Sequence, residues 1–135
     1  MSNPDFLPGD ATESEPSVTC NTEFRRDVSL SYNRLGDVQL QLGDTAQALG
    51  FYEKALAVAE ELVKLDLANT QFRRDVWASL WRFGDLEEKL GNKAAAKDRF
   101  TQVIERLQEM KRLGILAPVD EEWIGKAESR RAALQ

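Results

Sequence analysis

An Arg-Arg-Asp triplet occurs twice in this 135-residue chain, at residues 25–27 and again at residues 73–75. A guanidinium group presents a planar fork of donors that suits carboxylates and phosphates, so the triplets suggest an anion-binding site. The alternative is that these charges are solvated or pair with one another. Arg82 lies three residues before Asp85, for example, and that spacing favours a pair within one helix.

Catalytic and metal-binding chemistry have little to build on in this sequence. It contains no His and a single Cys, Cys20, which excludes an internal disulfide and the usual histidine-based zinc, haem and acid–base sites. The adjacent acids Glu121 and Glu122 fit the first turn of a helix, and no glycine-rich phosphate loop is present. We therefore expect no enzyme activity, no cofactor and no bound metal.

The composition is typical of one small soluble domain, with 42% apolar and 30% charged residues. No apolar run is long enough for a transmembrane span, and the N-terminus lacks the features of a secretory signal, so we expect a cytoplasmic protein without membrane contact. The net charge of −5 argues against a nucleic-acid partner. Residues 1–20 hold three of the four prolines and no Lys or Arg, which predicts a disordered acidic tail.

The rest of the chain is an internal duplication. Residues 21–66 align with residues 69–114 at a constant offset, and 17 of the 46 positions are identical. Unrelated sequences of average composition would share about one position in fifteen. We therefore expect a helical repeat domain over residues 21–135, with repeat 1 at 21–68, repeat 2 at 69–116 and a capping helix at 118–134. The last segment is equally compatible with a truncated third repeat.

Each repeat is predicted to be a pair of amphipathic helices. Apolar residues at helical spacing follow the cap-type residues Asn21 and Asn69, which predicts first helices at about 23–42 and 71–90. A Leu-Gly pair then ends each first helix, and the next residue starts the second helix. The second helices carry apolar stripes at steps of three and four: Ala48, Tyr52, Ala55, Leu56, Ala59, Leu62 and Val63 in repeat 1, and Ala96, Phe100, Val103, Ile104, Leu107 and Met110 in repeat 2.

Both repeats carry small and aromatic residues in a recognisable order. They are Tyr32, Leu35, Gly36, Gly43, Ala48, Tyr52 and Ala55 in repeat 1, and Leu80, Phe83, Gly84, Gly91, Ala96 and Phe100 in repeat 2. With these residues the chain resembles the tetratricopeptide repeat family over residues 29–62 and 77–110. The common repeat has about 34 residues, and the repeats of this chain, residues 21–68 and 69–116, are longer. The chain is therefore similar to the variants with longer helices found in large bacterial proteins. The resemblance implies an all-α fold, an α-solenoid of two tandem helical hairpins and a C-terminal capping helix.

In this family the first helix of each repeat lines a concave groove that binds a partner. Carried over to this chain, the candidate partner-binding residues are Arg26, Asn33, Asp37, Arg74, Trp77, Trp81, Asp85 and Lys89. Trp81 is the most prominent, because large aromatic side chains dominate binding hot spots. The alternative is that Trp77 and Trp81 pack against neighbouring helices.

Two acids of this stripe bear on the choice of partner. Family members that bind the acidic C-termini of chaperones carry an Asn where this chain has Asp37 and Asp85. Carboxylates at these positions would repel a terminal carboxylate, so we expect a different kind of ligand.

The resemblance implies a protein–protein interaction or scaffolding module, part of or accessory to a larger bacterial protein or complex. Its partner would be a protein or peptide segment bound through the concave face. The alternative is structural self-association as a homodimer or larger homo-oligomer. Two repeats and one cap leave an open apolar end, and a second copy of the chain would cover it.

Overall fold

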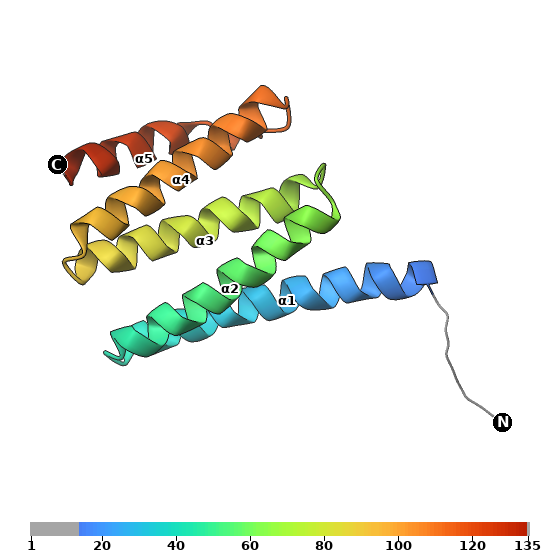
Figure 1. Ribbon diagram of the computed structural model, residues 1–135, viewed down its shortest axis with the longest axis horizontal. Coiled ribbons are helices and arrows are strands. Elements are labelled where there is room, and N and C mark those ends of the chain that lie inside the picture. The colour runs from blue at the N-terminus through green and yellow to red at the C-terminus, as the bar shows by residue number, and fades with distance from the viewer. Residues whose placement is uncertain (1–13, 135) are drawn as a thin grey trace.

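In a computed structural model, which describes residues 14–134, the chain is a stack of five α-helices. They are α1 (Ser14–Gln41), α2 (Thr45–Leu65), α3 (Thr70–Lys89), α4 (Lys93–Arg112) and α5 (Glu122–Ala133), with a 3-10 turn, η1 (Pro118–Asp120), before α5. Each helix packs against the next, so that α1 and α2 form one end of the stack and α5 the other (Figure 1). The described residues contain no strand, and the predicted all-α fold is confirmed.

Helix α1 begins earlier than the sequence predicts. It starts at Ser14, well before the start expected from Asn21, so residues 14–20 of the expected tail are helical. Pro16 falls in the first turn of α1, where its missing N–H removes no helical hydrogen bond. The rest of the expected tail, residues 1–13, lies outside the described residues.

The two cap-type asparagines behave differently because of the chain that precedes them. The chain reverses direction between α2 and α3, and Asn69 caps α3 there, its Oδ1 accepting a hydrogen bond from Phe72 N at 3.0 Å. No described element before α1 forces such a reversal, so the helical backbone runs on through Asn21. A cap residue starts a helix only where the preceding chain leaves the helical path.

The turns inside the repeats form as predicted. Gly43 has φ 85° and Gly91 has φ 83°, the left-handed conformation that ends a helix. Asp44 then caps α2, its Oδ1 accepting a hydrogen bond from Gln47 N at 3.1 Å. Asn92, which the same pattern predicts as a cap for α4, instead directs its amide to the carboxylate of Glu87 at 2.8 Å.

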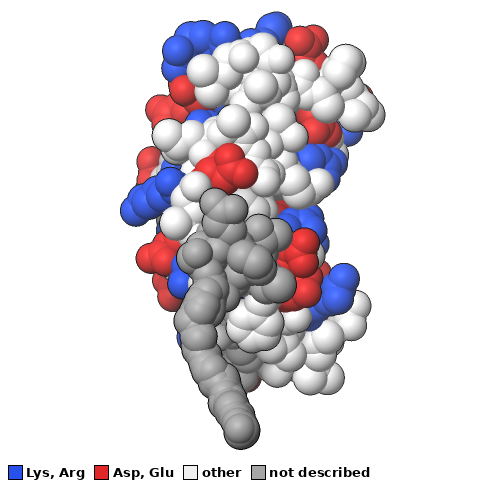
Figure 2. Space-filling view, turned by 90° about the vertical axis from the view of Figure 1, so that its right-hand side faces the viewer, with Lys and Arg blue, Asp and Glu red and all other residues white. Residues whose placement is uncertain are grey.

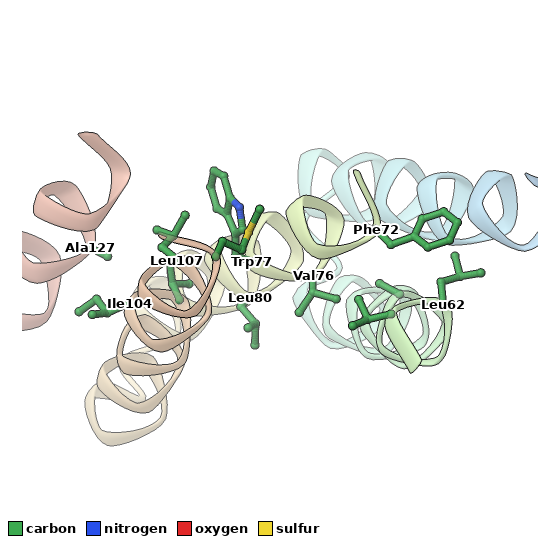
Figure 3. Close-up of a cluster of buried hydrophobic side chains, with 12 residues drawn as sticks. Leu62, Phe72, Val76, Trp77, Leu80, Ile104, Leu107 and Ala127 are labelled. Atoms are coloured by element: carbon green, nitrogen blue, oxygen red, sulfur yellow. The ribbon is translucent and has the colours of Figure 1, made fainter. Parts of the chain in front are cut away.

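A continuous core joins the second helix of one repeat to the helices of the next. The largest cluster of buried side chains runs from Leu62 of α2 through Val76 and Leu80 of α3 to Leu107 of α4, and reaches Ala127 of α5 (Figure 3). All six residues of the stripe predicted for α4 are buried, at 4% exposure or less. The segment predicted as a capping helix thus packs on α4 and extends the core.

Candidate functional site

Three tryptophans meet on the side of the stack formed by α1, α3 and α5, called here the α1–α3–α5 face. The Trp81 ring lies edge-on to the Trp123 ring, with centroids 5.0 Å apart, and edge-on to the Phe100 ring at 5.1 Å. The Trp77 ring lies 5.8 Å from Trp123. Trp77 is only 3% exposed, whereas Trp81 and Trp123 are half-buried. Trp77 therefore belongs to the core, while Trp81 and Trp123 also present surface to solvent.

A hollow of about 300 Å³, called here the tryptophan hollow, opens beside these rings. It is lined by Arg74, Trp77, Ala78, Trp81, Arg82 and Trp123. Its aromatic surface is bordered by two half-exposed guanidinium side chains, Arg74 at 49% and Arg82 at 42% exposure. A second, more open hollow also includes Trp81 and is otherwise lined by α5 residues. Mostly apolar surface with a few placed polar groups is the usual make-up of a ligand-binding depression.

One arginine of each triplet pairs with an acid of the following unit. Arg26 donates to both carboxylate oxygens of Asp75, with distances of 2.7 and 3.3 Å. Its counterpart Arg74 binds Asp120 of η1 in the same way, at 2.9 and 3.3 Å. These two-point contacts tie each first helix to the next unit. The triplets therefore contribute to the stacking of the repeats, which favours paired charges over an anion-binding site.

The pair predicted between Arg82 and Asp85 within α3 does not form. Arg82 Nε lies 3.6 Å from Asp37 of repeat 1, and Asp85 accepts a hydrogen bond from Arg130 of α5 at 2.9 Å. Lys89 also lies 3.3 Å from Asp85. Arg82 and Arg130 occupy the same position in successive units, and each reaches back to the unit before it. The prediction is wrong because an acid on the neighbouring helix is better placed than one on the same helix.

Hydrogen bonds favour the charged forms of Asp85 and Arg74. Burial alone would raise the pKa of Asp85, but hydrogen bonds from Arg130 and Lys89 outweigh it and hold that pKa below its ordinary value. The hydrogen bond to Asp120 raises the pKa of Arg74 above that of a free arginine. Both groups therefore remain charged at neutral pH.

Two further predicted residues lie in contacts between helices. Asn33 is 6% exposed, and its Nδ2 donates to Ser79 Oγ at 3.2 Å. Asp37 accepts a hydrogen bond from the Tyr52 hydroxyl of α2, and burial together with this bond raises the pKa of Tyr52. Asn33 and Asp37 therefore link α1 to its neighbours.

The tryptophan hollow contains three of the predicted residues, Arg74, Trp77 and Trp81. Sequence reasoning missed Trp123 and Arg82 as members of the site. Trp123 stands at the start of the last helix, and the likeness of that start to the opening of repeat 2 was the available signal, because it places Trp123 beside the first helix of repeat 2. Arg82 lies next to Trp81 in the chain, but the residues predicted for the first helix of repeat 2 are three or four apart and leave it out.

Aromatic surface and guanidinium donors are what this face offers a ligand. The Arg74 guanidinium lies 5.5 Å from the centroid of the Trp77 ring, and that of Arg130 lies 5.4 Å from the Trp81 ring. Within residues 21–134, no three His, Cys, Asp or Glu residues form a group suited to a metal ion. None of the described helices has the length and apolar character needed to cross a bilayer.

Comparison with known families identifies the repeats. Two family models match the chain, both described as tetratricopeptide repeat, one over residues 30–62 and the other over residues 78–106. Neither a curated protein nor a solved structure matches it. The first match spans the α1–α2 hairpin and the second the α3–α4 hairpin, and each begins within one residue of the stretch that the sequence pattern indicates. Both hairpins therefore carry tetratricopeptide repeats.

Proposed function

We propose that this protein binds a segment of a partner protein on its α1–α3–α5 face, with the tryptophan hollow as the anchor point. Tetratricopeptide repeats generally mediate protein–protein interaction and scaffolding. The observation that supports this site is the half-buried pair Trp81 and Trp123, which lies beside two adjoining hollows. Aromatic residues at the centre of a recessed patch are the usual energetic anchors of an interface.

The chemistry of the hollow favours a particular kind of segment. An arginine has five N–H donors, and Arg74 uses two nitrogens for Asp120, so it retains donors for a ligand. Arg82 is only loosely associated with Asp37, at 3.6 Å. A segment with an aliphatic or aromatic side chain next to a carboxylate or a free backbone carbonyl would satisfy both the rings and these guanidinium groups.

Broad electrostatic attraction contributes little on the side of the molecule shown in Figure 2. Acidic and basic side chains are interspersed there along both edges of the stack, and neither sign gathers into a field. Asp37 and Asp85 offer acceptors and no amide donor, which supports a ligand other than an acidic C-terminal tail.

The test is a selection of peptides from a random library on the immobilised full chain. We expect the selected peptides to share an apolar residue beside an acidic one. Ala78→Arg fills the hollow from a partly exposed position of α3, and should weaken their binding at least tenfold. Ala94→Arg places the same charge at an exposed position of α4, away from the hollow, and should leave binding unchanged.

Trp81→Ala separates binding from packing. A binding residue should lose about 2 kcal/mol or more of binding free energy on this change while the helical content stays intact. A core residue should instead lose about 3–5 kcal/mol of unfolding free energy. Peptides that bind Ala78→Arg and wild type equally, or a large loss of stability without a binding defect, would contradict the proposed site.

Self-association is the second candidate function, and it uses a different surface. Phe24, Leu35 and Val38 of α1 are large apolar residues left exposed at the repeat 1 end of the stack. A place in the cytoplasm stays a prediction from the sequence features of membrane spans and secretory signals, and a role within a larger bacterial complex stays a prediction from the family resemblance.

A further inference from the structure

The repeat 1 end of the stack carries an apolar surface that no described helix covers (Figure 1). We call it the open face, and define it by Phe24, Val28, Leu35 and Val38 of α1 with Phe51 and Val58 of α2. Phe24 is 66% exposed, Leu35 44% and Val38 47%. Exposed large apolar side chains gathered at one end of a stack mark an interaction surface.

In repeat 2, the corresponding surface is buried against a neighbouring repeat. The counterparts of the four α1 residues are Phe72, Val76, Phe83 and Leu86, which are exposed by 8%, 1%, 1% and 1%. They are buried because repeat 1, chiefly α2, packs against α3. The duplication therefore indicates that this side of a repeat is built to receive a helix of another repeat.

The two α2 residues of the open face are apolar where repeat 2 is charged. Arg99 and Arg106 of α4 stand at the positions of Phe51 and Val58. Arg106 binds both carboxylate oxygens of Glu60, at 2.9 and 2.7 Å, and the Arg99 guanidinium lies 4.2 Å from the Phe83 ring centroid. The outer surface of a terminal repeat is normally polar, for solubility. Repeat 1 has apolar residues there instead, as an interface requires.

The opposite end of the stack, formed by α5, is polar where the open face is apolar. Helix α5 buries Ala127 against the core and exposes mainly polar residues, among them Glu122, Lys126, Glu128 and Ser129. A head-to-tail contact between two copies would therefore cover the apolar open face with a polar helix. Contact between two open faces matches apolar with apolar surface, and the symmetry of such a contact is a two-fold rotation.

Charges at the open face suit a two-fold contact. A hollow of about 390 Å³ lies between α1 and α2, lined by Phe24, Arg25, Val28, Ala57, Val58 and Glu61. Arg25 and Glu61 carry opposite charges on different helices, and neither has an ion-pair partner among residues 21–134. In a two-fold interface, each residue of one copy meets the same partner position in the other. Arg25 of each copy can thus meet Glu61 of the other.

We propose that two copies of this chain pair through their open faces, with Arg25 of each copy against Glu61 of its partner copy. The contact buries the exposed phenylalanine of α1 and the apolar side of α2 in the way that repeat 1 buries the corresponding surface of repeat 2. This interface lies at the end of the stack and is separate from the tryptophan hollow, so a dimer leaves the proposed peptide site accessible.

The first test is the mass of the full chain by sedimentation, for wild type and for Val58→Arg. Repeat 2 carries Arg106 at the equivalent position, so the helix tolerates this residue. We expect a wild-type dimer, and dissociation at least tenfold stronger for Val58→Arg, whose circular dichroism should match wild type. The control Gln108→Arg adds the same charge at an exposed position of α4 and should remain dimeric.

The second test uses charge reversal and does not depend on folding differences. Arg25→Glu alone brings four acids together in a homodimer, and Glu61→Arg alone brings four bases together, so each variant should be monomeric. An equimolar mixture of the two variants restores both opposite-charge contacts, because the carboxylate introduced by Arg25→Glu then meets the guanidinium introduced by Glu61→Arg. A mixed dimer in sedimentation supports the proposal, since pairing within one chain cannot produce it.

Three results would overturn the proposal. Wild type that stays monomeric up to millimolar concentration shows that no copy covers the face. A dimer that survives Val58→Arg uses another surface. A monomer that dimerises only after residues 1–13 are deleted shows that the chain's own N-terminal segment occupies the open face. None of these results bears on peptide binding at the tryptophan hollow, which Ala78→Arg tests separately.

Discussion

The Tyr52 ring lies against the backbone of Gly36, so that a side chain at residue 36 has no room. A Cβ atom there would lie 2.6 Å from Tyr52 Cδ1 and 3.2 Å from the carbonyl oxygen of Ala48. The arrangement recurs in repeat 2, where a Cβ atom on Gly84 would lie 3.0 Å from Phe100 Cζ. At the helix spacing of each hairpin, a residue larger than glycine at these positions would therefore have to displace the aromatic ring.

Gly36→Ala should lower the unfolding free energy by more than about 1 kcal/mol, because the added methyl group displaces Tyr52. Gly50 is the matched control, since it lies inside α2 and a Cβ atom there would meet nothing within 4 Å. Gly50→Ala should raise the unfolding free energy by up to about 1 kcal/mol, because alanine is the better helix former. Urea titration measures both, and a gain at residue 36 as well would show that the hairpin is packed differently.

The ion pair between Arg26 and Asp75 should contribute more to stability than that between Arg82 and Asp37. Asp75 is 10% exposed and receives two hydrogen bonds, whereas the second pair is 42% and 45% exposed at 3.6 Å. A double-mutant cycle with Arg26→Gln and Asp75→Asn should give a coupling of about 1–3 kcal/mol. The same cycle on the exposed pair should give less than about 1 kcal/mol, and equal couplings would contradict the argument from burial.

Acid should destabilise the protein in part through Asp85. Its pKa is lowered in the folded state, so the carboxylate stabilises the fold above the unfolded-state pKa of about 3.9, and this contribution is lost as the pH falls through the folded-state pKa. Asp85→Asn should therefore reduce the difference in urea midpoint between pH 7 and pH 3. Asp27→Asn, at an exposed position of α1, is the control. A pH dependence of Asp85→Asn identical to wild type would rule out this role.

Trp77 and Trp81 should differ in their effect on folding, although they lie one turn apart. Trp77→Ala removes a side chain that is 3% exposed, and should cost about 3–5 kcal/mol of unfolding free energy. Trp81→Ala should cost less, because one side of the half-buried ring already faces solvent. The ratio of the two losses in thermal or urea unfolding tests the division of these residues between core and binding surface.

Periodicity made the second helices predictable, because each buried position of α4 recurs at steps of three or four and needs only the helix itself to be specified. The left-handed conformations of Gly43 and Gly91 were equally predictable from the sequence, since the chain must reverse direction between two helices that pack together. The ion-pair partners of Asp85 were not predictable from the sequence. They depend on how far one first helix slides along the next, and nothing within a single helix encodes that offset.

The tryptophan hollow shows the same limit. Its α3 residues follow from the family pattern, but Trp123 joins them only because η1 sets the path of the chain into α5. The early start of α1 had a different cause. Asn21 has the residue type of a cap but lacks a preceding turn, and a sequence pattern copied from repeat 2 cannot reveal that difference.

The ion pairs between units give the stack a property that neither hairpin has alone, which is that it can be lengthened from within. Arg82 reaches back to Asp37 and Arg130 to Asp85, while Arg26 reaches forward to Asp75. A further copy of residues 69–116 inserted before α5 would place the counterpart of Arg82 beside Asp85 and the counterpart of Asp75 beside Arg74, but the counterpart of Arg106 would face Gln108 where Arg106 itself meets Glu60. The ion pairs between successive first helices would therefore form again in a longer array, whereas the pair between the second helices would not.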